Sequence, residues 1–181
     1  MKQENKHRLP LFWRLTLIIT AAWFLLLSVT LGVTVRFALR SMEDKIDNVL
    51  MSTVVTLGNS PNIRRILERG YCDEEMADYL TDVVVNTEDM EFITIADSNS
   101  IRLFHIEPEL IGQPFEGGDQ HRALAGEVYI SDATPLNNQM QRRAFHPILD
   151  DGGNVLGFVM ASATHERIDA LRGDIYVSYL G

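Results

Sequence analysis

Cysteine and the common catalytic motifs are almost absent from this chain, and each absence removes a class of function. The single cysteine among 181 residues, Cys72, excludes an internal disulfide and a zinc site built on cysteines. The net charge of −9 argues against nucleic acid as a partner. The sequence has no phosphate-binding loop, no Gly-x-Ser-x-Gly elbow, no His-Glu-x-x-His motif and no glycine box of an ATP-binding domain. We therefore expect no catalytic residue, no metal site and no cofactor within these residues.

Charge is also missing from one long segment near the start, residues 15–35. These 21 positions between Arg14 and Arg36 contain no charged residue. At about 1.5 Å per residue, a helix of this length spans the roughly 30 Å hydrocarbon core of a bilayer. A cleaved secretory signal is the alternative, although its apolar core usually has about 7–15 residues and ends in a small-x-small site. We predict an uncleaved transmembrane helix in contact with membrane lipid.

Positive charge is concentrated before this segment. Residues 1–14 carry a net charge of +3, and four Lys/Arg residues precede the apolar run whereas three follow it directly. Lysine and arginine favour the cytoplasmic side of a membrane protein. We therefore expect residues 1–14 in the cytoplasm, the helix in the inner (plasma) membrane of the cell, and residues 36–175 as an extracytoplasmic domain.

Beyond the apolar run, the periodicity of apolar residues changes from helical to strand-like near residue 91. Before this point, apolar residues recur at three- and four-residue steps in three segments. After it, alternating segments separated by turns indicate antiparallel strands. The expected helices are 36–58, 62–69, 73–87, a short one at 119–125 and an exit helix at 164–181 that leads towards a second transmembrane segment. The expected strands, within a sheet core at 91–163, are 91–97, 101–106, 127–133, 141–149 and 155–163, which gives an α+β fold class.

Arginine and histidine recur on two of the expected strands, against an acidic background. Arg102 and His105 lie on the second strand, and Arg142 and Arg143 on the fourth. Strand alternation puts Arg143 and Phe145 on one face and Arg142 on the other. Because arginine binds carboxylates with two parallel hydrogen bonds, neighbouring strands would form a cationic cup for a small polyanion. Surface ion pairs with the many carboxylates of the chain are the alternative interpretation.

Residues 91–163 closely resemble the extracytoplasmic domain of the citrate and C4-dicarboxylate sensor histidine kinases (CitA/DcuS type). The likeness rests on IRLFH (101–105), IGQPFEGGD (111–119), ALAGE (123–127) and RRAFHPILDDGGNVLGFV (142–159). The most specific part is Arg-x-x-His followed by Ile-Gly-x-Pro-Phe. The resemblance implies a PAS-like (PDC, or single Cache) fold, a five-stranded antiparallel sheet flanked by helices.

The same resemblance implies a set of ligand-binding residues. In this family the arginine and histidine of Arg-x-x-His bind ligand carboxylates, which points to Arg102 and His105. The phenylalanine of Ile-Gly-x-Pro-Phe lines the pocket, which points to Phe115. The arginine four residues before the strand proline is the second carboxylate clamp, and counting back from Pro147 selects Arg143.

Two further positions bear on the choice of ligand. Phe145 stands where citrate sensors of this family typically carry lysine, which favours malate, fumarate or succinate. Thr94 occupies a place where a hydroxyl contacts the ligand in citrate-type sensors, which favours citrate. The loop at 134–138 departs from the glycine-containing loop common in the family. We expect a C4-dicarboxylate first and citrate next.

Together, these expectations describe the input domain of a two-component histidine kinase, in a sequence that does not include the catalytic part of the kinase. It would bind a small di- or tricarboxylate, form a homodimer, and signal through the absent kinase to a cognate response regulator. Two alternatives stay open. The same sensor could serve another output, such as a chemoreceptor or a cyclic-dinucleotide enzyme, or the chain could be an anchored structural or partner-binding domain with no small ligand.

Overall fold

The computed structural model of the chain describes residues 10–88, 90–133 and 141–164. The chain divides into two compact units, Met1–Met42 and Glu43–Gly181. The predicted loop at 134–138 lies outside the described residues. So does the predicted exit helix at 164–181, apart from Thr164, which ends a strand.

The first helix, α1 (Leu11–Gly58), contains the apolar segment predicted from residues 15–35. Nearly all of the side chains in this segment are exposed. Among the described residues, α1 is the one helix that is long and apolar enough to cross a membrane. Length and composition therefore agree with the predicted membrane helix, although the same two properties also fit a signal sequence near an N-terminus.

The next two helices begin and end within one residue of the predicted positions. Helix α2 (Pro61–Arg69) ends at Gly70, whose positive φ of 76° suits a residue without a side chain. Helix α3 (Glu74–Asn86) begins after Asp73. The Asp73 carboxylate accepts a hydrogen bond of 3.0 Å from the N–H of Met76, which satisfies one of the free donors of the first turn.

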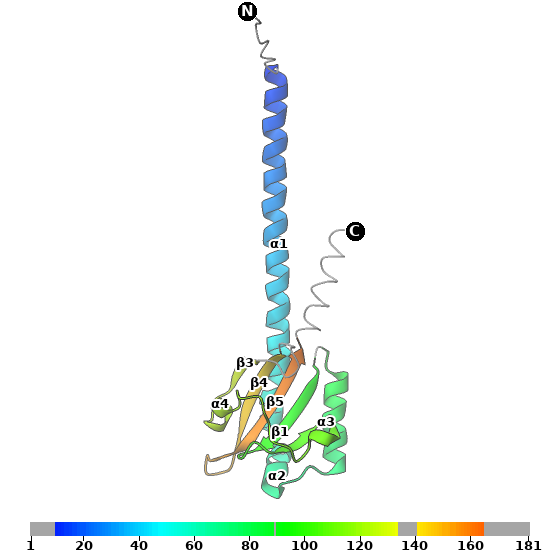
Figure 1. Cartoon of the computed structure of the whole chain (residues 1–181), viewed down its shortest axis with the longest axis vertical. Coiled ribbons are helices and arrows are strands. Elements are labelled where there is room, and N and C mark those ends of the chain that lie inside the picture. Colours follow the sequence, from blue (N-terminus) through cyan, green and yellow to red (C-terminus); the bar gives the residue numbers. More distant parts are fainter. Residues whose placement is uncertain (1–9, 89, 134–140, 165–181) are drawn as a thin grey trace, which may run out of the picture. The chain divides into compact units, whose positions relative to one another are not determined.

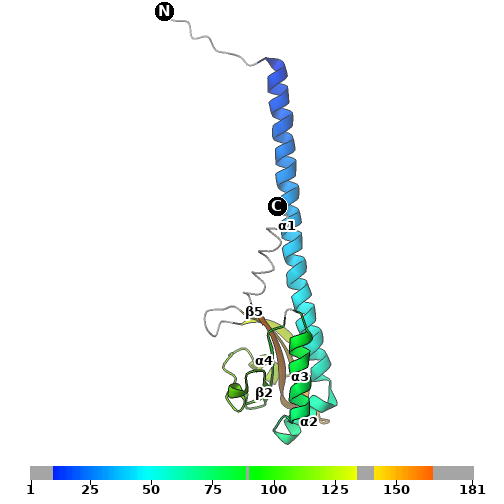
Figure 2. The same cartoon turned by 90° about the vertical axis from the view of Figure 1, so that its right-hand side faces the viewer.

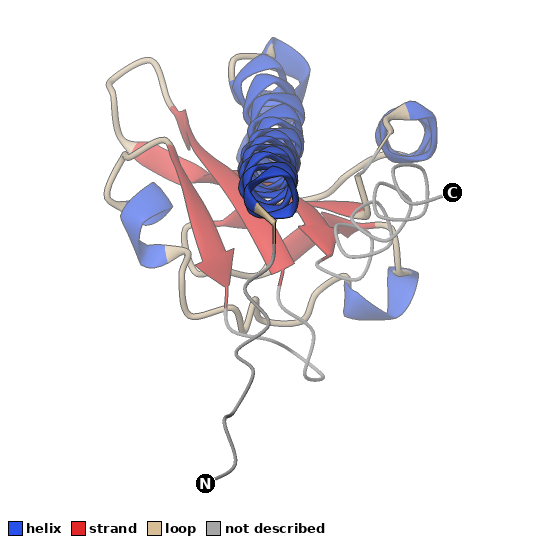
Figure 3. Cartoon of the chain, turned by 90° about the horizontal axis from the view of Figure 1, so that it is seen from above, coloured by secondary structure: helices blue, strands red, loops and turns tan. Residues whose placement is uncertain are grey.

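Five antiparallel strands form one sheet in the order β2-β1-β5-β4-β3. Figure 1 shows β5 and β4 side by side in this sheet, and Figure 3 shows the sheet from above. The strands and the two short helices between them are β1 (Phe92–Asp97), β2 (Arg102–His105), η1 (Pro108–Leu110), α4 (His121–Leu124), β3 (Tyr129–Ala133), β4 (Gln141–Leu149) and β5 (Val155–Thr164). The five predicted strands are confirmed, and their observed ends differ from the predicted ones by at most two residues. The α+β fold class is also confirmed.

The two faces of the sheet are covered differently. Residues 43–58 of α1, together with α2 and α3, pack on one face in a large apolar core that includes Leu50, Ile63, Leu80 and Ala144. We call this the helix face. The other face carries α4 and a smaller aromatic cluster, and we call it the cavity face. Figure 2 shows α2 and α3 on one side of the strands and α4 on the other.

A β-bulge decides which side of the sheet Arg102 faces. Two residues of a strand that are three positions apart, as Arg102 and His105 are, normally point to opposite faces. Here the register of β1 with β2 shifts, so that His105 lies opposite Thr94 while Arg102 lies opposite Ala96. Thr94 and Ala96 share a face, and their partners therefore share it too. The extra residue in β2, Leu103, brings the arginine and the histidine to the same side.

Candidate functional site

A cavity of about 670 Å³ opens on the cavity face, a volume typical of small-molecule sites. Strands β1, β2 and β4 and the segment 106–116 form its wall. Five of the six residues predicted to bind ligand line it: Thr94, Arg102, His105, Phe115 and Arg143. The structure therefore brings together side chains that are spread over 50 residues of sequence.

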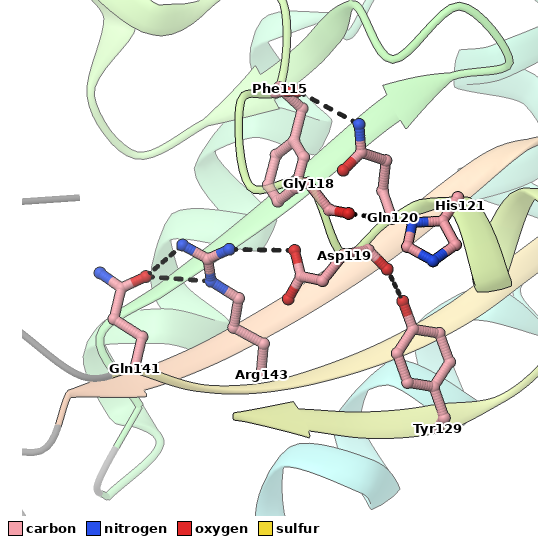
Figure 4. Close-up of polar contacts among 8 residues, drawn as sticks. All are labelled: Phe115, Gly118, Asp119, Gln120, His121, Tyr129, Gln141 and Arg143. Carbon is pink, nitrogen blue, oxygen red and sulfur yellow. Dashed lines mark hydrogen bonds and ion pairs between the residues drawn. The ribbon is translucent and has the colours of Figure 1, made fainter. Parts of the chain in front are cut away.

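Arg143 is the most deeply buried charge in the described part of the chain, with 1% of its surface exposed. Gln141 Oε1 accepts hydrogen bonds from its Nε at 3.0 Å and its Nη2 at 2.7 Å. Asp119 Oδ1 accepts from its Nη1 at 3.1 Å (Figure 4). A buried cation requires a paired anion, and Asp119 supplies one within the protein.

Arg102 is also buried, at 8% exposure, but has fewer protein partners. Its Nη1 donates to the carbonyl oxygen of Pro114 at 2.6 Å. Its buried Nε finds no hydrogen-bond acceptor among the residues that the structure describes. Burial lowers the pKa of this guanidinium, and the charge of Arg143 lowers it further, while Glu116 acts in the opposite direction. An anion that contacts both guanidinium groups would offset both effects, because it stabilises their charged form.

Phe115 lies close to both guanidinium groups. Its ring centroid lies 5.3 Å from Cζ of Arg102 and 5.5 Å from Cζ of Arg143. Both distances allow a cation–π interaction, which favours a cation over the face of an aromatic ring. The phenylalanine thus stabilises both cations of the cavity wall.

His105 is neutral in this arrangement. Its Nδ1 accepts a hydrogen bond of 3.0 Å from the backbone N–H of Glu107, so the proton of the neutral ring resides on Nε2. Burial, and after it the charge of Arg102, lower the pKa of His105 to about 4. The ring is therefore uncharged at neutral pH in the ligand-free protein. Its Nε2–H serves as a neutral donor.

Two buried hydroxyl groups on the same face lack a hydrogen-bond partner within the described ranges. They are Thr94 Oγ1, which lines the cavity, and Ser162 Oγ on β5, which lies opposite Arg143. Both residues are fully buried. Buried hydroxyls are normally hydrogen-bonded, so unpaired ones next to a cavity indicate a site that a polar ligand or water completes.

Phe145, the sixth predicted residue, lies behind the cavity wall. Its ring is fully buried, stacks on Tyr129 at 5.0 Å and meets Phe115 edge-on at 6.2 Å. The cavity lining does not include it among the described residues. Its role in ligand choice stays a prediction, and any influence would pass through the position of Phe115.

Sequence reasoning missed Asp119 and Gln141, which hold Arg143, and the four carboxylates of the cavity lining (Glu91, Glu107, Glu109 and Glu116). Asp119 belongs to the motif IGQPFEGGD, so the motif did carry a signal. Gly117 supports this interpretation, because a Cβ atom there would lie 2.5 Å from Arg143 Nη1 and 2.6 Å from Asp119 Oδ1. A side chain at this position would require Phe115, Arg143 or Asp119 to shift.

Comparison with known proteins identifies the fold and its relatives. Residues 41–174 match the family described as single cache domain 3. Sensor protein CitS of Halalkalibacterium halodurans is 30% identical over 159 residues, which are 87% of this chain and 28% of that protein. A probable C4-dicarboxylate sensor kinase of Bacillus subtilis is 27% identical over 163 residues, 88% of this chain and 30% of that protein.

A solved structure gives the same result. The crystal structure of the Escherichia coli DcuS sensor domain superposes with a TM-score of 0.62 at 30% identity. The match covers 70% of this chain and 94% of that one.

The chain spans less than a third of the length of the two curated relatives above. The predicted PAS-like fold and the predicted family are confirmed. The chain belongs to the single Cache domain family and is homologous to the sensor domains of the citrate and C4-dicarboxylate sensor histidine kinases.

Proposed function

We propose that this domain binds a small di- or tricarboxylate in the cavity described above, with malate, fumarate or succinate favoured and citrate next. The observation that carries the proposal is the pair of buried arginines, Arg102 and Arg143, which both line the cavity and both lie close to Phe115. One carboxylate would bind at each guanidinium. His105 Nε2–H and Thr94 Oγ1 would donate to the ligand between them.

The cavity suits a short ligand with charge at both ends. Arginine pairs strongly with carboxylates because its planar fork offers parallel donors. The four glutamates of the lining disfavour a more highly charged anion. Each charge-assisted hydrogen bond contributes about 1.5–3 kcal/mol before the cost of ordering the ligand, so we expect dissociation constants between micromolar and millimolar.

The domain would be the sensing input of a membrane-bound histidine kinase. In this proposal residues 15–35 of α1 cross the inner membrane, residues 1–14 lie in the cytoplasm and residues 36–175 lie outside it. The length and apolar composition of α1 support the anchor, and the two curated relatives named above are a sensor protein and a probable sensor kinase. A homodimer, a kinase domain beyond this chain and a cognate response regulator complete the proposal.

Calorimetric titration of the whole chain in detergent micelles tests the ligand directly. Malate, fumarate, succinate and citrate are compared with succinamide, which has the size of succinate but no charge. Saturable heat with at least one C4-dicarboxylate and none with succinamide is expected. A folded chain that gives no heat with any of the four acids, or equal heat with succinamide, would contradict the proposal.

A further inference from the structure

Asp119 forms an ion pair with Arg143, the arginine that the proposed function assigns to a ligand carboxylate. Its Oδ1 is 3.1 Å from Arg143 Nη1, and three nitrogen atoms of Arg143 are already bonded to Gln141 and Asp119 (Figure 4). A ligand that approaches this guanidinium therefore meets an anion of the protein. Resting on the proposed function, we propose that the Asp119 carboxylate is an internal counterion of Arg143 and that a ligand carboxylate replaces it.

The surroundings of Asp119 favour such an exchange. One carboxylate oxygen contacts Arg143, while the other, Oδ2, is buried and has no hydrogen-bond partner in the described segments. A carboxylate with one unsatisfied buried oxygen is held in place mainly by the opposite charge. Once a ligand carboxylate neutralises Arg143, this attraction is lost and the two anions repel each other.

Hydrogen bonds anchor the backbone around Asp119, so rotation of the side chain alone suffices for the exchange. The Asp119 carbonyl oxygen accepts a hydrogen bond from the Tyr129 hydroxyl. The neighbouring Gly118 carbonyl oxygen lies 2.9 Å from His121 Nδ1, and Gln120 Nε2 donates to Phe115 O at 3.4 Å (Figure 4). The segment is thus anchored on both sides of the aspartate. Its side chain is 15% exposed, which leaves a path towards solvent.

The exchange has a measurable consequence for affinity. In wild type, binding energy is used to displace Asp119 from Arg143. Asp119→Asn keeps the size of the side chain but removes the competing charge. We expect this variant to bind malate about tenfold more tightly, which corresponds to about 1.4 kcal/mol.

The control is Glu127→Gln, which also removes a carboxylate paired with an arginine. Glu127 contacts Arg122 at 2.8 Å, and both side chains are about half exposed. This variant of the whole chain, titrated with malate in the same micelles, should bind within about twofold of wild type, because an exposed pair is screened by solvent. The proposed exchange is wrong if Asp119→Asn binds malate more weakly than wild type, or no more tightly than Glu127→Gln. Asp119 would then be a positioning residue for Arg143.

A second measurement uses only the wild-type chain and does not depend on the folding of a variant. In a crystal structure with malate bound, we expect the Asp119 carboxylate to have left Arg143. A contact that persists beside the bound ligand would overturn the inference while leaving the proposed function intact. If neither wild type nor a folded Asp119→Asn chain binds any of the four carboxylates, the proposed function fails and the exchange fails with it.

Discussion

Arg142 and Arg143 are neighbours on β4, yet the two faces of the sheet give them different surroundings. Arg142 points to the helix face, where its Nε and Nη2 each donate to Asp47 of α1 at 2.6 Å. Both side chains of this pair remain about a quarter exposed. Arg143 points to the cavity face and is almost completely buried. Arg142 therefore forms a partly exposed ion pair between α1 and the sheet, whereas Arg143 lies buried in the wall of the cavity.

The two faces also differ in their buried polar side chains. The strand register places all of those among the described residues on the cavity face: Thr94, Arg102, His105, Arg143 and Ser162. The buried residues of the helix-face core are apolar. Burying polar groups costs stability unless they are paired, so their concentration on one face indicates that function, not packing, selects them.

The largest effect is expected for Arg102→Ala on the cavity face. This arginine has an unpaired buried Nε, so its loss removes ligand contacts at little cost to the protein's own hydrogen bonds. Two charge-assisted hydrogen bonds to a carboxylate are worth about 4 kcal/mol, or about a thousandfold in the dissociation constant for malate. Titration calorimetry measures it. Arg64→Ala on α2 is the control, and a loss below threefold for Arg102→Ala would contradict the assignment.

The helix face should respond in stability and not in binding. Leu50→Ala removes a fully buried side chain from the core of this face, and we expect the free energy of unfolding to fall by about 3 kcal/mol. The affinity for malate should stay within twofold. Val55→Ala, on an exposed position of the same helix, should change stability by less than about 0.5 kcal/mol. Chemical denaturation gives both values. A large loss of affinity for malate in Leu50→Ala would contradict the separation of stability and binding between the two faces.

His105 should make the ligand-free protein less stable in mild acid. Its pKa of about 4 in the folded protein lies below the unfolded value of about 6.5, so the unfolded chain binds a proton that the folded chain does not. The free energy of unfolding contributed by this residue therefore falls as the pH drops from about 6.5 towards 4. His105→Gln should flatten this part of the profile, measured by denaturation at several pH values. The exposed His121→Gln should leave it unchanged, and identical profiles for His105→Gln and wild type would contradict burial of the ring.

The smallest effect is expected for the ion pair on the helix face. Because Arg142 and Asp47 are partly exposed, solvent screens them, and a double-mutant cycle of Arg142→Ala and Asp47→Ala should give a coupling of about 1 kcal/mol. The readout is again chemical denaturation. A coupling near zero would show that the contact between β4 and α1 rests on apolar packing alone.

Much of the fold follows from periodicity, and the site follows only in part. Alternation along β4 correctly separated Arg143 from Arg142, because a regular strand fixes the face of each side chain. The same rule would have separated Arg102 from His105, since the bulge at Leu103 depends on pairing with β1 and leaves no local signal in β2. Asp119 lies in the motif IGQPFEGGD, but periodicity could not predict its contact with Arg143, because that contact depends on how a loop returns across the sheet.

The neighbouring arginines provide the most direct test of the division between the two faces. Arg142→Ala and Arg143→Ala, each in the whole chain, are titrated with malate side by side at a temperature where both remain folded. We predict that Arg142→Ala binds within about twofold of wild type and that Arg143→Ala binds about a hundredfold more weakly, because only Arg143 faces the cavity. Equal affinities for the two variants would contradict the account.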